Sequence, residues 1–336
     1  MNSRAGIKVV CLGGGSGLST LLSGLKQVAL HSPFQIDGHA LHLQNITGIV
    51  TVSDEGGSSG RIRRQFQTPA PGDVRNCLVA LASDESLMTE LFRYRFRGKG
   101  ELQDHSLGNL LLTALADITG DFHKAIQLSS QVLAVEGQIL PSTKENVRLQ
   151  ATLSDGSEVT GETTIAASSL PIRSVGLQPE SCLPLPETLE AMGSADIITI
   201  GPGSLFTSLI PNLVVKGIVE AVEASPAVRI YIGNLMTQHG ETDHLSASEH
   251  LKAIQRHMGG RLLFNHVLLN SQPVSPEMLA RYEEEEADPV ENDISSLEDM
   301  GVKVHKLPLL REEEKVRHHP VKLAEAILQV FGRENG

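Results

Sequence analysis

The chain of 336 residues carries 40 acidic and 28 basic side chains, which gives a formal net charge of −12 at pH 7. This excess of negative charge disfavours nonspecific binding to nucleic acids or to anionic membranes, because both need a positive protein surface. Apolar residues make up 40% of the sequence, and no uninterrupted apolar stretch is long enough to cross a bilayer. We therefore expect a folded protein with no membrane insertion and no nucleic-acid partner.

The first six residues lead directly into an apolar stretch and lack the pattern of a secretory signal. The cysteines Cys11, Cys77 and Cys182 are widely spaced and odd in number, so they indicate neither a disulfide framework nor a metal site. Both observations favour a cytoplasmic location.

The first predicted strand covers residues 7–12 and ends at a glycine-rich loop, after which a helix is predicted over residues 16–29. Glycines at such a junction let the backbone approach a ligand, and the free N–H groups at the helix start favour an anion. The loop has neither the G-x-G-x-x-G spacing nor a Walker lysine, but phosphate binding is still the favoured hypothesis. Its candidate residues are Gly13, Gly14, Gly15, Ser16 and Gly17.

A second strand is predicted over residues 47–54, followed by a glycine-serine loop up to residue 60. Asp54 at the strand end could hold a ribose hydroxyl, a substrate hydroxyl or a metal ion. Residues 56–60 also match the G-x-S-x-G pattern of serine hydrolases, but Ser58 stands too far beyond the strand for that elbow, so a hydrolase is disfavoured. The further candidates from this loop are Ser59 and Gly60.

Four helices are predicted next, over residues 73–82, 86–96, 106–118 and 121–135. Asp73 is a plausible N-cap. Arg75 stands in a first helical turn, where the helix dipole disfavours a cation, and this placement suggests a bound anion nearby. Its neighbour Asn76, together with His105 and Asn109 around the start of a later helix, completes this group of candidates.

Residues 137–189 show little helical period, and we predict a small β-rich insertion there. An alternating stretch over 147–153, the Asp155–Gly156 turn and a return over 158–162 indicate a hairpin. The remaining residues, 1–136 and 190–336, would form the nucleotide-binding core.

Strands and helices alternate again after the predicted insertion. The strands are predicted at 196–200, 228–232, 263–269 and 302–306, and the helices at 246–258, 275–286 and 320–331. This alternation predicts a Rossmann-like three-layer α/β/α fold with a mostly parallel sheet. Loops at the carboxyl ends of such strands form the ligand crevice. They add the candidates Gly201, Gly203, Ser204, Asn234 and Thr237.

Six of these loops, taken in order, resemble the YvcK-like gluconeogenesis factors of the CofD-like superfamily. The matching segments are 13–17, 51–61, 71–76, 105–110, 201–208 and 236–242. The enzymatic branch of that superfamily is the 2-phospho-lactate transferase of the deazaflavin coenzyme pathway. Two positions depart from the family pattern: Glu55 replaces a second Asp, and Asp104 replaces a Gly. The first departure weakens any inference of a metal held by an Asp pair.

The resemblance implies a cytoplasmic, regulatory protein that binds a small-molecule ligand, a UDP-sugar or related nucleotide, and is needed for normal cell shape and for growth on gluconeogenic carbon. The alternative it implies is a transferase that moves a phospholactyl-type group from a nucleotide diphosphate donor to a deazaflavin-like acceptor. Only that alternative would need magnesium, and no metal site is otherwise predicted. No catalytic residue is assigned, and a homo-oligomer is left open.

Overall fold

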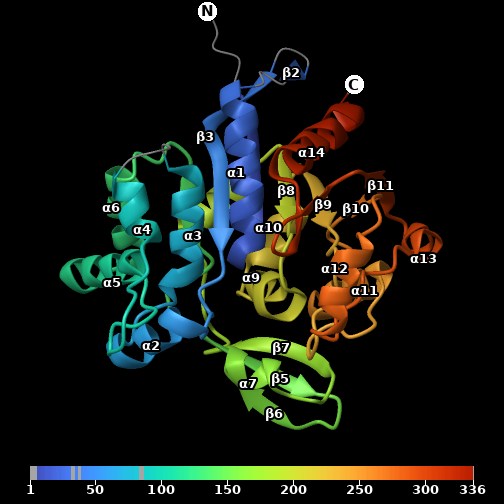
Figure 1. Ribbon diagram of the computed structural model, residues 1–336. Coiled ribbons are helices and arrows are strands. Elements are labelled where there is room, and N and C mark those ends of the chain that lie inside the picture. Colours follow the sequence, from blue (N-terminus) through green and yellow to red (C-terminus); the bar gives the residue numbers. More distant parts are fainter. Residues whose placement is uncertain (1–5, 32–34, 37–38, 83–86, 336) are drawn as a thin grey trace, which may run out of the picture.

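The computed structural model describes residues 6–31, 35–36, 39–82 and 87–335, and places them around one central sheet (Figure 1). Its eight strands follow the order β11-β10-β9-β8-β1-β3-β2, with β4 paired to β3. All pairs in this sheet are parallel except β2 with β3, so the predicted α/β fold with a mostly parallel sheet is confirmed. The strands are β1 Ile7–Gly13, β2 Gln35–Ile36, β3 His39–Val50, β4 Gln138–Pro141, β8 Ile197–Ile200, β9 Val228–Ile232, β10 His266–Asn270 and β11 Lys303–Leu307.

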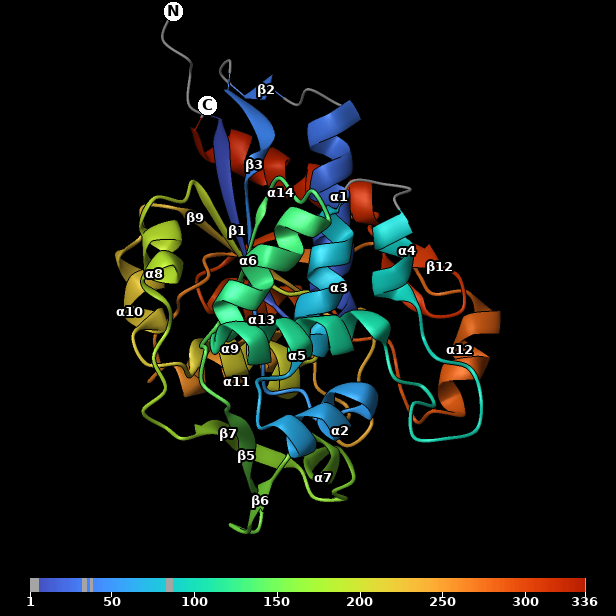
Figure 2. The ribbon, with the colours of Figure 1, turned by 90° about the vertical axis from the view of Figure 1, so that its left-hand side faces the viewer.

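Helices cover both faces of the sheet. Helix α1 (Gly15–His31) packs against α3 (Pro71–Leu81) and α14 (Pro320–Asn335). Helices α8 (Pro186–Gly193) and α10 (Ile218–Ala224) pack together on the opposite side, as Figure 2 shows. The other helices are α2 Gly57–Phe66, α4 Leu87–Arg93, α5 Leu107–Thr119, α6 Phe122–Val132, α7 Glu162–Ala166, the π-helix η1 Leu205–Leu209, α9 Ile210–Leu213, α11 Ala247–His257, α12 Pro276–Glu283 and α13 Ile294–Asp299.

The strand order contains a reversal beside β1. From β1 the chain first builds outward through β3 and β4, and it later returns to build β8 to β11 on the other side of β1. The order therefore reverses between β1 and β8. In open α/β sheets the ligand binds beside such a reversal, at the carboxyl ends of the strands.

A small antiparallel sheet lies below the main one in Figure 1. It contains β5 (Arg148–Leu153), β6 (Glu158–Thr160) and β7 (Ile172–Gln178), and the predicted hairpin is confirmed as β5 paired with β6. Two elements of the expected 137–189 insertion belong elsewhere, since β4 pairs in the main sheet and α8 packs against α10. The division of the chain into a core and an insertion stays a prediction. A second hairpin, β12 (Leu310–Glu312) with β13 (Val316–His318), was not predicted.

Two local predictions around the second strand were wrong. Strand β3 ends at Val50 rather than Asp54, because only Thr51 N–H still bonds to β1, at the carbonyl of Gly13, and the carbonyl of Val52 instead accepts the N–H of Ala70, which lies outside the sheet. The expected glycine-serine loop is the first turn of α2 instead. Its Ser58, Ser59 and Gly60 are buried, and this tertiary packing overrides their weak helix propensity.

Some predictions fall at the edge of the described residues. The helix predicted over 86–96 is α4, which ends at Arg93 because Leu107 N–H bonds to the carbonyl of Tyr94. Ser86, where that prediction began, and residues 1–5 lie outside the described part of the chain. Within the described part, no single helix is long and apolar enough to span a bilayer. One strongly bent pair, Leu205–Leu213 with Ile218–Ala224, reaches the required length and composition only when taken together.

Candidate functional site

A cavity of about 440 Å³ lies where the carboxyl ends of β8 and β9 meet the start of α1. This volume falls within the range of small-molecule sites, roughly 300–1,000 Å³. The cavity lies beside the reversal of strand order, which is where open α/β sheets bind their ligands. Six of the sequence-predicted residues line it, namely Ser16, Gly17, Gly203, Ser204, Asn234 and Thr237.

The start of α1 supplies the part of the wall suited to an anion. Gly15 takes a φ of +60°, which lets the chain leave β1 and enter the helix at once. Ser16 and Gly17 stand in the first turn, whose N–H groups have no acceptor within the helix. The helix dipole adds to their attraction for a negative group.

The opposite wall comes from the last third of the chain. Among the described residues, Arg317 is exposed at the cavity and makes no ion pair, whereas its neighbour Lys315 pairs with Glu285 at 3.6 Å. His318 bonds to the carbonyl of Gly233, and burial lowers the pKa of His318 to about 4. Its imidazole is therefore neutral near pH 7, and no described residue makes a hydrogen bond to its Nε2.

Sequence reasoning missed these three wall residues, Lys315, Arg317 and His318. They follow the glutamate run by about thirty positions and match no ligand-binding pattern. The one available signal was the return of positive charge between residues 315 and 317 after an acidic stretch.

The carboxylate of Glu241, from the loop after β9, binds the start of η1, which follows the second glycine loop at residues 201–204. Thr207 Oγ1 donates a hydrogen bond to Glu241 Oε1 at 3.1 Å, and the N–H groups of Phe206 and Thr207 also reach the Glu241 carboxylate. Burial raises the pKa of Glu241 to about 7. A side chain of the loop after β9 thus occupies the start of η1, so Gly203 and Ser204 line the cavity without leaving that helix start free.

A second polar region, which we call the acid pit, lies beside the same glycine loop and contains Asp54 and Asp73. A Cβ built on Gly14 would lie 2.8 Å from Asp73 Oδ2, so only glycine fits there. The N–H of Gly15 bonds to the Asp73 carboxylate. Burial, together with the charge of Asp54, raises the pKa of Asp73 to about 7.

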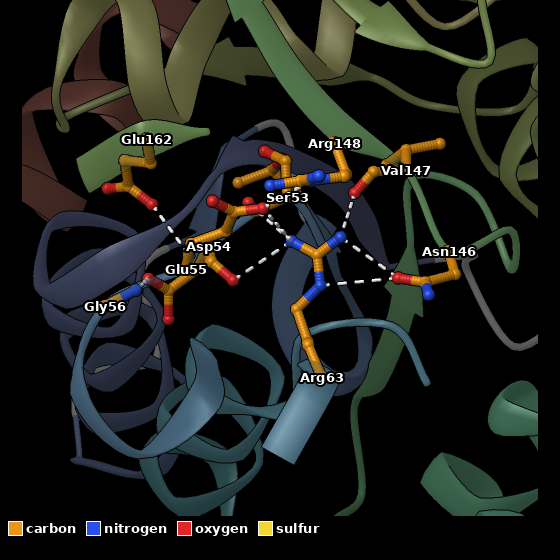
Figure 3. Close-up of polar contacts among 10 residues, drawn as sticks. Ser53, Asp54, Glu55, Gly56, Arg63, Asn146, Val147, Arg148 and Glu162 are labelled. Atoms are coloured by element: carbon orange, nitrogen blue, oxygen red, sulfur yellow. Dashed lines mark hydrogen bonds and ion pairs between the residues drawn. The ribbon is translucent and has the colours of Figure 1, made fainter. Parts of the chain in front are cut away.

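Glu162, the first residue of α7 beside the small sheet, lies next to Asp54 of the acid pit, as Figure 3 shows. Glu162 Oε2 accepts the N–H of Glu55 at 3.1 Å, and a side-chain hydrogen bond joins Glu162 to Asp54. Burial and the charge of Asp54 raise the pKa of Glu162. Sequence reasoning missed Glu162, because the pairing across more than a hundred residues leaves no local pattern.

Buried Arg63 joins the loop after β3 to the segment that enters the small sheet (Figure 3). Its Nη1 donates to the carbonyls of Ser53 and Asp54 at 2.9 and 3.3 Å. Its Nη2 donates to Asn146 Oδ1 at 3.0 Å and to the carbonyl of Val147.

Glu55, which departs from the family pattern, completes this junction. Arg148 Nε donates to Glu55 Oε1 at 3.0 Å, and Arg63 Nη1 lies 3.7 Å from the same oxygen. Glu55 therefore binds the two arginines of this junction, and it supplies no second carboxylate to pair with Asp54.

Ser58, His105 and Asn109 meet between α2 and α5. Ser58 Oγ lies 3.2 Å from His105 Nδ1 and accepts hydrogen bonds from Asn109 Nδ2 and the Ser106 N–H. Ser58 is only 5% exposed and stands within a helix, not at a strained turn directly after a strand. This geometry gives no support to a serine hydrolase.

Arg75 is buried beside this group and does not line the cavity. Its Nη2 donates to Asn76 Oδ1 at 2.6 Å and its Nη1 to the carbonyl of Phe92, while its Nε has no acceptor in the part of the chain that the structure describes. Burial lowers the pKa of Arg75 to about 10.

The other predicted residues shape the backbone around these groups. Gly13 ends β1, and Gly201 takes a φ of +90° before Pro202. Ser59 lies against Gly72, and Gly60 lies against the carbonyl of Glu55. The structure therefore divides the predicted site into a cavity, an acid pit and a buried group between helices.

Three comparisons relate this chain to known proteins. Residues 9–310 match the family model described as 2-phospho-L-lactate transferase CofD. The chain is 45% identical over 322 residues to the gluconeogenesis factor of Halalkalibacterium halodurans, covering 96% of this chain and 95% of that one. It is 44% identical over 325 residues to the gluconeogenesis factor of Bacillus subtilis, covering 96% and 98%. A crystal structure of a UPF0052 family member from Bacillus halodurans superposes with a TM-score of 0.90 at 44% identity, covering 97% of this chain and all of the other.

Proposed function

The chain belongs to the CofD family and is similar throughout to gluconeogenesis factors, and from this premise we propose that it is a cytoplasmic regulatory protein that binds a UDP-sugar. The observation that carries the proposal is the cavity at the reversal of strand order, which is lined both by Ser16 and Gly17 of the first turn of α1 and by Arg317, a residue without an ion pair in the described part of the chain. Ligand occupancy would then report carbon status to envelope synthesis, and through it to cell shape.

The cavity offers partners for the diphosphate and for a hydroxyl group of such a ligand. The first turn of α1 and the guanidinium of Arg317 suit the diphosphate, because both favour negative oxygens. The side-chain oxygen of Asn234 has no hydrogen-bond partner among the described residues and suits a ribose or sugar hydroxyl. Neutral His318 offers a ring nitrogen that can accept a hydrogen bond.

Thermal unfolding in the presence of UDP-glucose, UDP or uridine tests the proposal, since a ligand that binds only the folded state raises the apparent Tm. We expect the largest rise with UDP-glucose, a smaller one with UDP and little with uridine. Equal rises with UDP and uridine would show that the phosphates are not recognised. If millimolar UDP-glucose does not raise the apparent Tm, the proposal that the protein binds a UDP-sugar is wrong.

The acid pit favours one alternative, a CofD-like transferase. Asp54 and Asp73 offer carboxylate oxygens, which magnesium prefers. Among the described residues, however, no group of three or more His, Cys, Asp or Glu side chains could hold a metal ion. Only the transferase alternative would need magnesium.

Asp54→Asn separates the two hypotheses. In the regulatory one, the substitution leaves UDP-glucose binding nearly unchanged, because Asp54 does not line the cavity. The wild-type protein, given a phospholactate-linked nucleotide diphosphate and a deazaflavin acceptor, should form no product with or without magnesium. Magnesium-dependent product that disappears in Asp54→Asn would replace the regulatory proposal by the enzymatic one.

A further inference from the structure

Two loops that line the cavity are joined by one side chain. The loop after β9 contributes Gln238 to the cavity wall, and the glycine loop before η1 contributes Ser204. Glu241 follows Gln238 by three positions and does not itself line the cavity. Its side chain instead reaches the first turn of η1, so it connects the two loops behind the wall.

The contact of Glu241 with η1 satisfies a helix start. Glu241 Oε1 accepts a hydrogen bond from Thr207 Oγ1 at 3.1 Å, and the N–H groups of Phe206 and Thr207 reach the same carboxyl group. N–H groups at this position have no acceptor within their own helix. Glu241 Oε2 has no hydrogen-bond partner among the described residues, so the contact does not need the second oxygen. Burial raises the pKa of Glu241 to about 7, and an uncharged amide is therefore a close substitute for its carboxyl group.

The backbone around Glu241 forms a closed turn, which we call the 238–242 turn. The N–H groups of Glu241 and Thr242 both donate to the carbonyl of Gln238, at 3.0 and 2.9 Å. The N–H of Gln238 donates in return to Thr242 Oγ1 at 2.9 Å. Because these hydrogen bonds join both ends of the turn, a contact that fixes Glu241 also fixes Gln238.

Gln238 is the residue through which this turn reaches the cavity. Its main-chain N–H and carbonyl are both bonded within the turn, whereas its side-chain amide makes no hydrogen bond to a described residue. An amide carries both donors and an acceptor. It therefore suits a ligand that offers hydroxyl and carbonyl groups together, as a UDP-sugar does.

We propose that Glu241 is a positioning residue of the cavity, which holds the 238–242 turn on η1 and thereby presents the amide of Gln238 to the ligand. The ligand part of this proposal rests on the proposed UDP-sugar site. The contact with η1, in contrast, belongs to the protein without ligand, so the two parts are tested separately.

Hydrogen exchange of the ligand-free full chain tests the contact with η1. Glu241→Ala should raise amide exchange in η1 and in the 238–242 turn by about tenfold or more and leave β9 unchanged, because only the first two segments lose the group that joins them. Glu241→Gln should exchange like the wild type, since its amide oxygen keeps the acceptor for Thr207. Glu298→Ala, which removes an exposed side chain from α13, is the control and should change neither segment.

Unchanged exchange in Glu241→Ala, or an equal rise over the whole chain, would overturn the proposal. Thr207→Val serves where Glu241→Ala does not fold, because it removes the hydroxyl donor to Glu241 and keeps the shape of the side chain. It should raise exchange in the same two segments by a smaller factor, and no rise in either segment would likewise overturn the proposal.

A double-mutant cycle tests the presentation of Gln238. In calorimetric titration with UDP-glucose, Gln238→Ala and Glu241→Ala should each raise Kd about tenfold, and the double variant should also raise it about tenfold rather than about a hundredfold. The losses do not multiply, because Glu241 has no amide to position once Gln238 is truncated. Combining Glu241→Ala with Arg317→Ala is the control, since Arg317 reaches the cavity from β13, and these two losses should multiply.

The conservative variant and the wild type complete the ligand test. Glu241→Gln should bind UDP-glucose with the affinity of the wild type. Losses that multiply in the Gln238 cycle, or an equal loss in Glu241→Gln and Glu241→Ala, would overturn the positioning role. A wild type that does not bind UDP-glucose would reject the UDP-sugar and with it the ligand part, whereas faster exchange in Glu241→Ala would still support the contact with η1.

Discussion

Gly17 of α1 lies so close to the carbonyl oxygen of Pro202 that a Cβ built on Gly17 would stand 2.2 Å from it. Pro202 follows β8, and Gly17 follows β1, so this contact fixes the two glycine loops against each other at the reversal of strand order. The position of the cavity wall depends on this approach, since both residues line the cavity.

Gly17→Ala should therefore damage both the fold and the cavity. The methyl group meets a backbone oxygen, which cannot rotate away, so we expect a loss of roughly 1–3 kcal/mol or more in the free energy of unfolding and weaker UDP-glucose binding. Gly13→Ala is the control, because its Cβ would make ordinary contacts of 3.4–3.9 Å with Leu18. Urea unfolding should show a lower free energy of unfolding for Gly17→Ala than for Gly13→Ala. Equal stabilities would show that the backbone at Pro202 shifts to accommodate the methyl group.

Arg317→Ala should weaken UDP-glucose binding by about one to two decades in Kd, because a charge-assisted hydrogen bond contributes about 1.5–3 kcal/mol. The loss should be smaller for uridine, which has no phosphate. Arg173→Ala removes an exposed arginine from β7, outside the cavity, and should leave the affinity unchanged. Calorimetric titration of the wild type and the two variants with UDP-glucose and with uridine measures these affinities. An equal loss of affinity for both ligands in Arg317→Ala would place Arg317 away from the phosphates.

Asp73 should make stability depend on pH. Its pKa is about 7 in the fold against an ordinary value of 3.8, so between these pH values the folded protein holds a proton that the unfolded chain has released. The free energy of unfolding then falls as pH rises from about 4 to about 7 and levels off above. Asp73→Asn removes this term, so relative to wild type the variant should gain up to about 4 kcal/mol between pH 4 and pH 8.

Urea unfolding at several pH values measures this difference. Glu241, whose pKa is also raised by burial, contributes equally in both proteins and cancels in the comparison, whereas the charge of Asp73 helps to raise the pKa of Glu162, so the variant also lowers the contribution of Glu162. Parallel profiles for the variant and the wild type would show that Asp73 ionises normally in the fold.

Arg63→Ala should destabilise the protein by about 3–5 kcal/mol. The substitution removes the hydrogen-bond donor of the buried carbonyls of Ser53 and Val147, and it leaves Glu55 with one arginine fewer. Arg63→Lys should not rescue it, since one ammonium group cannot reach acceptors on both segments. The neighbouring Arg64 is exposed, and Arg64→Ala should change stability by less than about 0.5 kcal/mol. A similar midpoint for both alanine variants would contradict the structural role of Arg63.

The sequence by itself determined the local elements and the ends of the strands at which the cavity lies. Buried apolar runs such as 7–12, each followed by glycines, predicted both the parallel sheet and the loops that line the cavity, because a parallel sheet aligns its carboxyl ends. Such patterns act over a few residues, so they can be found without knowing which segments meet.

Only the tertiary structure decided which polar groups share a space. Arg317 joins Ser16 in the cavity, and Glu162 joins Asp54 in the acid pit, across separations that no local pattern records. Packing also decided that residues 57–60 are helical, since burial outweighs the weak propensity of glycine and serine. Burial likewise shifted the pKa values of Asp73 and His318, because desolvation depends on what surrounds a group and not on its neighbours in sequence.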